Sequence, residues 1–251
     1  MPIQLHHIKS KLATTYVLEN TENTKPFVPD TALLCKKSFE RMIFEHNILY
    51  IKPDGGRKSK GIFRIDRLKE QFILRHSETS NIRKYTNTSS LWNDVYNLTK
   101  RKKYVIQQGV DSNTSDNRPF DLRCHAVRIK GKWVVAGICA RIGKQNGIVT
   151  TNYKGGNPTV IENLFTNYLH LSEEEQDELV KKLHFCILST VNTISPLYPL
   201  NKEFAVDIGI DSNKNVWIYE VNIEPLIRRN FKLLDDKSIY ERIRRLRSQA
   251  E

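Results

Sequence analysis

The sequence predicts an α+β fold in which antiparallel hairpins alternate with amphipathic helices. Apolar and polar residues alternate as in strands, on both sides of a polar turn, at residues 120–141 and again at 205–222. A segment from Ser172 to about Ile194 has apolar residues at helical spacing instead. Hairpins and helices in this combination are typical of α+β proteins.

The composition indicates a folded, cytosolic protein. With 251 residues the chain is long enough for one large domain or two interleaved ones, and its 39% hydrophobic content argues against disorder. No apolar run approaches the roughly 18 residues of a membrane span, and the N-terminus lacks the apolar stretch of a signal peptide. The cysteines are far apart in the sequence, so we expect reduced thiols at Cys35, Cys124, Cys139 and Cys186.

The excess of positive charge favours anionic partners. The 40 basic and 28 acidic residues give a formal net charge of +12. Such a surface attracts nucleotides, acidic peptides, anionic polymers or nucleic acid, without choosing among them. Nucleic acid is the less favoured alternative, supported by charge alone, because the chain has neither an RNA-binding aromatic signature nor a helix-turn-helix. The basic residues cluster at 57–60, 100–103, 228–229 and 242–247.

The N-terminal part is expected to be an extended lead-in followed by a helix. Residues 1–28 are polar and mixed, with a centre rich in Thr and Asn. After Pro29, Asp30 is a candidate N-cap for a helix that ends at about His46. One face of this helix would bury Cys35, Phe39, Met42 and Ile43.

A basic, glycine-rich loop at 54–61 separates a buried strand at 48–53 from a second strand at 62–65. Glycines allow backbone N–H groups to approach phosphate oxygens, and lysines add positive charge. The spacing differs from that of a Walker A loop, so a surface loop without phosphate is the alternative. Lys52 lies inside the end of the apolar strand and therefore needs an anionic partner.

Between residues 66 and 108 we expect short strands, one helix and a further strand. The helix begins at Ser89 or Ser90. The strand at 104–108 runs into Gly109, which marks either a hinge or a simple strand end. The helix would bury Leu91, Trp92, Val95 and Leu98.

The first long hairpin places charged residues of both signs on one face. We expect a Lys-Gly-Lys turn, with Ile129 paired to Trp133. In that register Asp121 lies opposite Arg141, and Arg123 is on the same face. A surface ion pair worth little is the alternative. An unpaired second arginine would instead leave positive charge suited to a phosphate or a developing oxyanion.

The longest helix is predicted from a capping box. Ser172 is followed three residues later by Glu175, at the start of the apolar stripe. His184 lies on this stripe, so we expect a core histidine rather than a metal ligand. A terminal helix at 239–248 carries four arginines, which suit an anionic partner. The stripe consists of Val180, Leu183, Ile187, Leu188 and Val191.

The second hairpin would place two carboxylates face to face. If Asp211 pairs with Val216, Asp207 lies opposite Glu220. Asn222 follows on the same face, whereas the other face would carry apolar side chains. Opposed carboxylates repel, so they need a proton or a cation between them. Two carboxylates and an amide oxygen suit Mg²⁺; an ordinary half-buried hairpin with a solvated acidic face is the alternative. The apolar face of the second strand would consist of Trp217, Tyr219 and Val221.

Several motifs occur together and in order. They are Y-I-K-P-D-G-G-R-K-S-K-G-I-F-R-I, Y-V-I-Q-Q-G-V-D, P-F-D-L-R, A-R-I-G, T-N-Y-K-G-G, D-I-G-I-D and V-W-I-Y-E-V-N. From about Val28 to Phe231 this set resembles the ATP-grasp superfamily, in particular its YheC/YheD family of endospore coat-associated proteins. The resemblance implies an α+β, ATP-grasp fold of two α+β subdomains that clasp ATP. We expect it without a full N-terminal pre-ATP-grasp domain, because fewer than 30 residues precede the first helix.

The resemblance also implies domain boundaries. A lead-in at 1–28 would precede an ATP-grasp domain at 29–251. Within that domain we expect a lid-like subdomain at about 48–105, a metal and acceptor subdomain at about 106–235 and a basic helix at 237–248.

Roles for single residues follow from the same resemblance. ATP would be bound by Lys52 and by Gly55, Gly56, Ser59, Lys60 and Gly61 of a lid loop, with an adenine hinge at Gln107, Gln108, Gly109 and Val110. Arg123 and Arg141 would face the transferred phosphoryl group and the acyl phosphate. Mg²⁺ would be held by Asp207, Glu220 and Asn222. The acceptor side would include Asp121, Asn152, Gly155, Gly156 and Arg228.

The activity implied is that of an ATP- and Mg²⁺-dependent carboxylate–amine ligase, which forms an amide or peptide bond through an acyl phosphate. Its substrates would be a carboxylate and an amine from peptides or amino acids, with an acidic acceptor favoured by the positive charge. An ATP-grasp phosphotransferase and a spore-coat-associated protein that binds nucleotide without turnover are the alternatives. The family further implies a bacterial protein associated with the spore.

Overall fold

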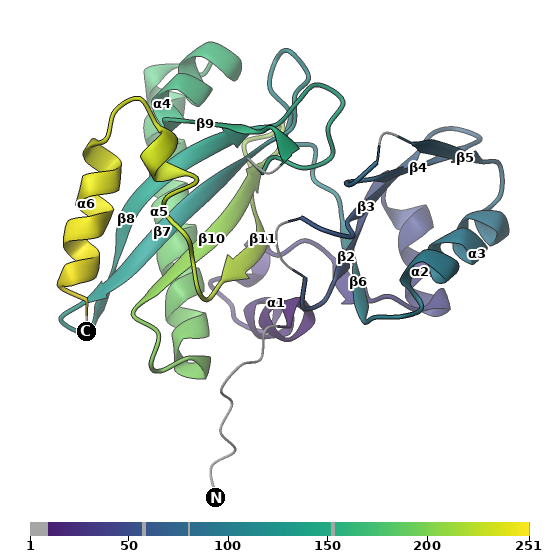
Figure 1. Cartoon of the computed structure of the whole chain (residues 1–251), viewed down its shortest axis with the longest axis horizontal. Helices are drawn as coiled ribbons and strands as arrows, with labels where there is room; N and C mark the ends of the chain where they lie inside the picture. The colour runs from purple at the N-terminus through teal and green to yellow at the C-terminus, as the bar shows by residue number, and fades with distance from the viewer. Residues whose placement is uncertain (1–9, 57–58, 80, 152–153, 251) are drawn as a thin grey trace, which may run out of the picture. The chain divides into compact units, whose positions relative to one another are not determined.

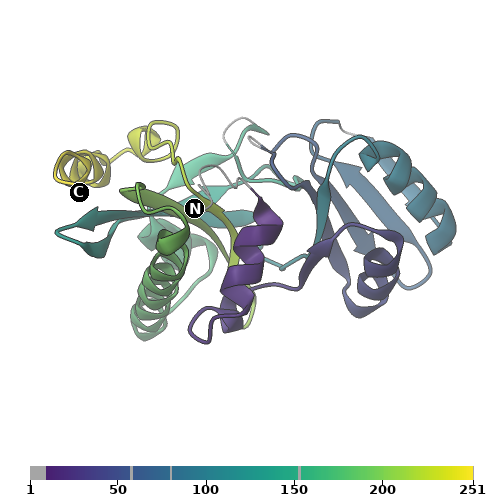
Figure 2. The same cartoon turned by 90° about the horizontal axis from the view of Figure 1, so that it is seen from below.

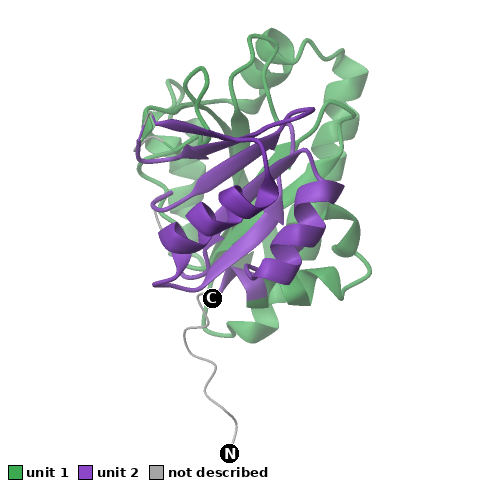
Figure 3. Cartoon of the chain, turned by 90° about the vertical axis from the view of Figure 1, so that its right-hand side faces the viewer, with its two compact units in different colours: residues 1–8, 13–28, 112–251 green, residues 9–12, 29–111 purple. Residues whose placement is uncertain are grey.

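The computed structural model describes residues 10–56, 59–79, 81–151 and 154–250. Among them, contacts divide the chain into two compact units (Figure 3). Unit 1 contains residues 13–28 and 112–250, and unit 2 contains residues 10–12 and 29–111. None of the helices in the described ranges is long and apolar enough to cross a membrane.

Unit 2 is built on a six-stranded antiparallel sheet (Figure 1). Helices α2 (Lys36–Glu45) and α3 (Thr88–Thr99) cover one face of it. Leu49 and Ile51 are buried in the same apolar core as Met42 of α2. The strands, in spatial order, are β1 (Thr31–Leu33), β6 (Tyr104–Gln108), β2 (Ile48–Pro53), β3 (Phe63–Arg67), β4 (Phe72–His76) and β5 (Ile82–Tyr85).

Two helix boundaries in unit 2 differ from the prediction. Asp30 is not an N-cap, because the residues after it pair with β6 as strand β1. Helix α2 begins later, with the exposed Cys35 as its N-cap. The side chain of Asn87 caps α3 by accepting a hydrogen bond from the Ser90 N–H at 2.8 Å. Helix α2 thus begins later than the sequence pattern indicated, and α3 begins earlier.

The expected lead-in is not extended. It contains helix α1 (Lys11–Glu19) and the short turn η1 (Lys25–Phe27). Leu18 and Phe27 are buried in the main core of unit 1. This burial of apolar surface, about 1.5–3 kcal/mol for each large side chain, explains why the segment folds despite its polar composition.

Unit 1 is built on a five-stranded antiparallel sheet with helices on both faces. Helix α5 (Glu173–Ile194) covers one face, and α6 (Ser238–Ser248) with the turn η5 (Phe231–Leu233) covers the other (Figure 2). Short helical turns α4 (Ile161–Asn163), η3 (Leu164–Tyr168) and η4 (Ser195–Leu197) flank α5. The strands, in spatial order, are β11 (Val216–Asn222), β10 (Glu203–Ile210), β7 (Phe120–Ile129), β8 (Lys132–Ile142) and β9 (Asn157–Thr159).

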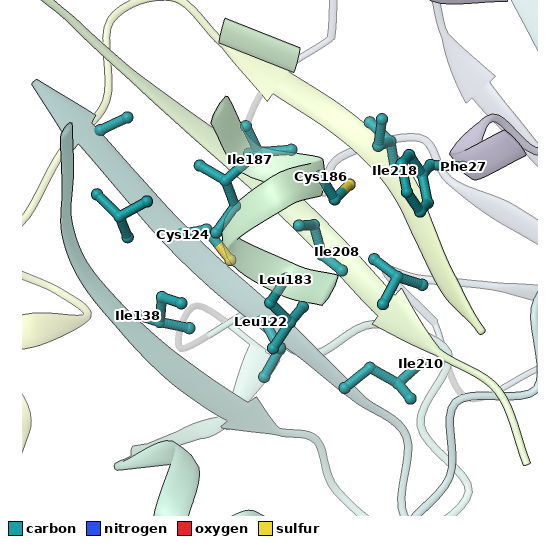
Figure 4. Packing of buried hydrophobic residues seen from close by; sticks show 14 of the residues in the cluster. Phe27, Leu122, Cys124, Ile138, Leu183, Cys186, Ile187, Ile208, Ile210 and Ile218 are labelled. Carbon is teal, nitrogen blue, oxygen red and sulfur yellow. The ribbon is translucent and has the colours of Figure 1, made fainter. Parts of the chain in front are cut away.

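The main core lies between this sheet and α5 (Figure 4). Leu122 and Ile208 project from the strands toward Leu183 and Ile187 of the helix. The capping box at Ser172 is confirmed, since Ser172 N–H donates to Glu175 Oε2 at 2.8 Å and Ser172 Oγ accepts from Glu175 N–H at 3.3 Å. The prediction for His184 is wrong: it is exposed beside the stripe. The buried stripe is Leu179, Leu183, Cys186, Ile187, Thr190, Val191 and Ile194.

The first hairpin has a shorter turn than predicted. Lys130 and Gly131 form a two-residue turn with φ values of 47° and 73°, so Ile129 pairs with Lys132 and not with Trp133. A β-bulge then shifts the register by one residue, because Ala136 of β8 is an extra residue opposite the step from His125 to Ala126 of β7. Beyond the bulge, Asp121 lies opposite Arg141 as predicted.

In the second hairpin, too, a bulge offsets a turn that differs in length from the prediction. Its loop is one residue longer than predicted, since Ile210 and not Asp211 pairs with Val216. A bulge then restores the register, and Asp207 lies opposite Glu220 as predicted. The predicted apolar face of β11 is wrong in part, because the residues in the core are Val216, Ile218 and, partly buried, Val221.

Candidate functional site

Four charged side chains on neighbouring strands of unit 1 form a buried cluster. Arg141 of β8 donates to both carboxylate oxygens of Asp121 on β7, with Nε–Oδ1 at 2.7 Å and Nη2–Oδ2 at 2.5 Å. Its Nη2 also lies 3.2 Å from Oδ2 of Asp207 on β10. Arg123 Nη1 lies 3.0 Å from the other oxygen of Asp207. All four side chains are at most 12% exposed. The strands therefore bring two arginines and two aspartates together.

Neighbouring charges keep Asp207 and Arg141 ionised. Burial alone would raise the pKa of Asp207, but the charges of Arg123 and Arg141 lower it below its ordinary value. Burial would likewise lower the pKa of Arg141, yet Asp121 and Asp207 raise it well above its ordinary value. Removing one member of such a group leaves a buried charge uncompensated, which typically costs about 3–5 kcal/mol.

Some buried polar atoms of the cluster have no hydrogen bond within the described residues. They are Nε and Nη1 of Arg123, Oδ1 of Asp207 and Nδ2 of the neighbouring Asn222. Arg123 and Asp207 attract each other as charges, but their geometry is not that of a hydrogen bond. Because buried polar groups normally have partners, these atoms indicate a place for a polar ligand.

The three predicted metal ligands lie on one face of this sheet. Asp207 is directly opposite Glu220, and Asn222 is opposite Ala205 on the same strand pair. Their carboxylate and amide oxygens are the donors that Mg²⁺ prefers, and the unsatisfied Oδ1 of Asp207 fits such an ion. The residues present therefore fit a magnesium site. The sequence did not indicate that Asp207 would also pair with both arginines.

Unit 2 has its own polar face, opposite the two helices. Lys52 Nζ donates to Gln107 Oε1 at 2.6 Å, and Gln107 Nε2 donates to Thr31 Oγ1 at 3.0 Å. The lysine nitrogen also lies 5.4 Å from the centre of the Tyr50 ring. Gln107 is buried, with 4% of its surface exposed. A neutral amide and an aromatic ring are thus among the contacts of Lys52.

A basic cluster on the same face was missed in the sequence. Arg64 Nε donates to Asp66 Oδ1 at 2.8 Å, and Arg75 Nη2 donates to Asp66 Oδ2 at 2.7 Å. These three residues are at most 22% exposed. With Lys52 they make three positive charges and one negative charge, a surface suited to phosphates. The alternation in F-R-I-D-R and F-I-L-R-H was the available signal.

The predicted lid loop is anchored near both ends. Gly61 N–H donates to Glu78 Oε2 at 3.1 Å, and Ser77 Oγ donates to Ser59 O at 2.8 Å. Lys11 Nζ donates to Gly56 O at 3.0 Å, while Gly55 and Lys60 are exposed. Ser59 and Gly61 both have left-handed backbones, with φ of 54° and 68°. The tip at 57–58 lies outside the described residues.

The predicted adenine hinge continues from β6. Gln108 N–H donates to Asp30 O at 2.8 Å, and Gly109 N–H donates to Ile48 O at 2.7 Å. A Cβ at position 109 would lie 2.2 Å from Cγ2 of Ile48, so only glycine fits. Val110 and Gln108 are half-buried.

Two glycines of the predicted acceptor loop are tightly packed within unit 1. Gly155 has φ of 81°, and a Cβ there would lie 2.2 Å from Cε of Lys144. At Gly156 a Cβ would lie 1.8 Å from the carbonyl oxygen of Thr150. These two glycines therefore lie against other parts of the chain. Lys144, which contacts this loop, was not predicted from the sequence. Of the other predicted acceptor residues, Arg228 is exposed and Asn152 lies outside the described residues.

The cysteines and one further acidic group carry no site. All four cysteines are free thiols as expected, and burial raises the pKa of Cys139 and of Cys186 to about 12. In unit 2, Asp30, Glu45 and His46 have ligand atoms close enough for a metal ion. Arg41 already donates to both carboxylates of that group, so its charge is balanced without an ion.

Comparison with known proteins agrees with these observations. The family model described as YheC/D like ATP-grasp matches residues 3–249. The endospore coat-associated protein YheD of Bacillus subtilis (strain 168) is 27% identical over 215 residues, which cover 83% of this chain and 46% of YheD. The chain thus spans less than half the length of this relative.

Solved structures show the same fold at low sequence identity. The ATP-grasp ligase PsnB, in complex with a phosphomimetic variant of a minimal precursor, Mg and ADP, is 11% identical with a TM-score of 0.54. That match covers 98% of this chain and 61% of PsnB. The VanG D-Ala:D-Ser ligase from Enterococcus faecalis is 12% identical with a TM-score of 0.53, over 96% of this chain and 61% of VanG. The α+β, ATP-grasp fold is therefore confirmed, and the chain belongs to the YheC/D-like ATP-grasp family.

Proposed function

We propose that this protein is an ATP- and Mg²⁺-dependent carboxylate–amine ligase, which forms an amide or peptide bond through an acyl phosphate. The observation that carries the proposal is the position of Asp207, opposite Glu220 and in contact with Arg123 and Arg141. At Asp207, oxygen ligands for a metal ion therefore lie next to buried arginines that can bind an anion. Phosphoryl transfer to a carboxylate needs both kinds of group.

The nucleotide side of the proposal rests on unit 2. Its polar face offers Lys52, Arg64 and Arg75 to phosphate oxygens, with Asp66 as the counter-charge. Gln107 to Val110 would bind adenine, and loop 54–61 would close over the phosphates. The family match and the likeness to PsnB, whose structure contains Mg and ADP, support these roles.

In the proposed reaction, an oxygen of the substrate carboxylate attacks the γ-phosphorus of ATP and ADP leaves. The amine nitrogen then attacks the acyl carbon of the resulting acyl phosphate, and inorganic phosphate leaves. Arg123 and Arg141 neutralise the negative charge on the transferred group and on the acyl phosphate. Asp207, Glu220 and Asn222 would hold Mg²⁺, which would supply further charge neutralisation.

The acceptor side would be formed by Asp121, Asn152, Gly155, Gly156 and Arg228. Amino acids or peptides are the proposed substrates, since VanG is named as a D-Ala:D-Ser ligase and PsnB was crystallised with a precursor. The net charge of +12 favours an acidic acceptor. A cytoplasmic, spore-associated role is proposed from YheD, which is described as endospore coat-associated.

Product analysis tests the proposal. Purified protein is incubated with Mg-ATP and pairs drawn from a panel of amino acids and acidic dipeptides, and ADP and phosphate are measured. Release that requires both an amine and a carboxylate supports a ligase. A phosphorylated product formed without an amine would show a phosphotransferase. Tight ATP binding without ADP release under any of these conditions would show a nucleotide-binding protein without turnover.

A further inference from the structure

The β-bulge in β11 decides on which face Glu220 lies. Val216 and Ile218 are buried in the core beneath the sheet. In a regular strand, side chains two residues apart share a face, so Glu220 would join these residues in the core. The bulge adds Tyr219 as an extra residue between the pairs Asp207–Glu220 and Ile208–Ile218. The extra residue thus turns Glu220 toward the polar face.

A pair of hydroxyl groups holds the extra residue in place. Tyr219 Oη lies 2.8 Å from Ser112 Oγ, and Ser112 is only 5% exposed. The backbone of Ser112 is itself fixed, because its carbonyl oxygen accepts from Phe120 N–H at 2.9 Å. The pair therefore ties the bulge of β11 to the start of β7.

Gly209 leaves the space that this arrangement needs. It precedes the loop on β10, two residues after Asp207 and on the same face. A Cβ at this position would lie 2.0 Å from Tyr219 Oη and 2.7 Å from Ser112 Oγ. Any side chain at position 209 would push the tyrosine away. Gly209, Ser112 and Tyr219 thus form one group of interdependent contacts, called the bulge lock.

We propose that Tyr219 and Ser112 are positioning residues for Glu220, and that the bulge lock sets the affinity of the site for its divalent cation. The inference rests on the proposed metal site. Neither hydroxyl group needs to touch the cation. They act by keeping the register that brings Glu220 to the face of Asp207.

The experiment measures cation binding and not turnover. Mn²⁺ replaces Mg²⁺ as the probe, and free Mn²⁺ is followed by electron paramagnetic resonance in the presence of a non-hydrolysable ATP analogue. Tyr219→Phe and Ser112→Ala should each weaken Mn²⁺ binding by about threefold to tenfold, the range expected from one hydrogen bond. The double variant should lose no more than either single variant, because both changes remove the same interaction.

Tyr198→Phe is the matched control. Tyr198 is a buried tyrosine of the same unit, 7% exposed, and packs against Phe204 in the main core rather than on the polar face. Its loss of a hydroxyl should leave Mn²⁺ affinity unchanged. Amide hydrogen exchange provides a second readout: residues 216–222 should exchange faster in Tyr219→Phe and at the wild-type rate in Tyr198→Phe.

The outcomes distinguish failure of this inference from failure of the proposed metal site. If Glu220→Gln binds Mn²⁺ as tightly as the wild type, the metal site itself is wrong and the inference falls with it. If Glu220→Gln loses the cation while Tyr219→Phe and Ser112→Ala retain wild-type affinity, the metal site stands and the bulge lock is overturned. Additive losses in the double variant would also overturn it.

Discussion

The buried His125 and the half-buried Glu203 form a pair beneath the C-terminal helix. His125 Nε2 lies 2.9 Å from Glu203 Oε2, and the other oxygen of Glu203 accepts from Arg247 of α6 at 2.5 Å. His125 is fully buried, and its Nδ1 has no hydrogen bond within the described residues. A neutral imidazole that donates through Nε2 fits this environment, whereas a second N–H would be left unsatisfied.

The pair predicts a loss of stability in mild acid. Burial, the largest cause, lowers the pKa of His125 despite the opposing effect of Glu203. The unfolded state therefore binds the proton more readily than the folded state. The contribution of neutral His125 to the free energy of unfolding is complete above about pH 6.5 and is lost as the pH falls below that value. Urea unfolding from pH 7.5 to pH 5 should show the decline, at up to about 1.4 kcal/mol per pH unit. In His125→Phe that part of the slope should be absent; an unchanged slope would contradict the assignment.

Loss of Arg141 should destabilise unit 1 strongly. Arg141→Met leaves Asp121 and part of Asp207 as buried charges without a partner, at a cost of about 3–5 kcal/mol. Arg244→Met is the control, because Arg244 is 59% exposed in its pair with Glu241. It should change the free energy of unfolding by less than about 1 kcal/mol. Similar values for the two variants would show that the buried cluster is not ionised as described.

Glu220→Gln should abolish most turnover while leaving the fold intact. The substitution removes one carboxylate charge from the proposed metal site, which we expect to cost several kcal/mol in kcat/KM. Glu241→Gln makes the same change on an exposed residue of α6 and should be without effect. Wild-type turnover of Glu220→Gln at saturating Mg²⁺ would remove Glu220 from the site.

Mg-ATP should protect loop 54–61 from trypsin. If the backbone of the loop binds phosphates, cleavage after the exposed Lys60 should slow when nucleotide is added. Cleavage after Lys102, which is exposed in the turn before β6, serves as the internal control. Equal protection at the two sites would point to global stabilisation by the ligand, and no protection at Lys60 would count against a lid.

Arg228 and Arg229 should determine the salt dependence for an acidic acceptor. Long-range attraction is screened within about 8 Å at physiological ionic strength and acts mainly on encounter. The KM for such an acceptor should rise steeply with salt in the wild type and less steeply in Arg228→Ala/Arg229→Ala, with kcat little changed. Arg244→Ala/Arg245→Ala removes the same charge from α6 and should follow the wild type. Superimposed profiles for all three proteins would exclude a role in acceptor binding.

The hairpins show how far sequence alone can predict the site. Alternation correctly placed Asp121 opposite Arg141 and Asp207 opposite Glu220. It did so although both turns were assigned wrongly, because in each hairpin a one-residue bulge offsets a one-residue error in the turn. A bulge depends on contacts from other elements, such as Ser112 with Tyr219, and these leave no local pattern.

Long-range contacts also explain the features that were missed. The N-terminus of α1 is capped by a residue far along the chain, since Asp54 accepts from Leu12 N–H at 2.9 Å and from Ser10 Oγ. The segment therefore lacks an N-cap signal of its own. His184 was misplaced because a stripe at helical spacing does not fix which edge faces the core. The charges at Arg64 and Arg75 were visible, but only the pairing of β3 with β4 shows that they share Asp66.

The path of the chain between the two units has a consequence for its synthesis. Residues 29–111 complete the sheet of unit 2, whereas residues 13–28 belong to unit 1 and precede it. On a ribosome, unit 2 can therefore close while Leu18 and Phe27 still await α5 and β10, which are made much later. Until those elements are made, Leu18 and Phe27 have no core to pack into, which leaves residues 13–28 open to misassembly.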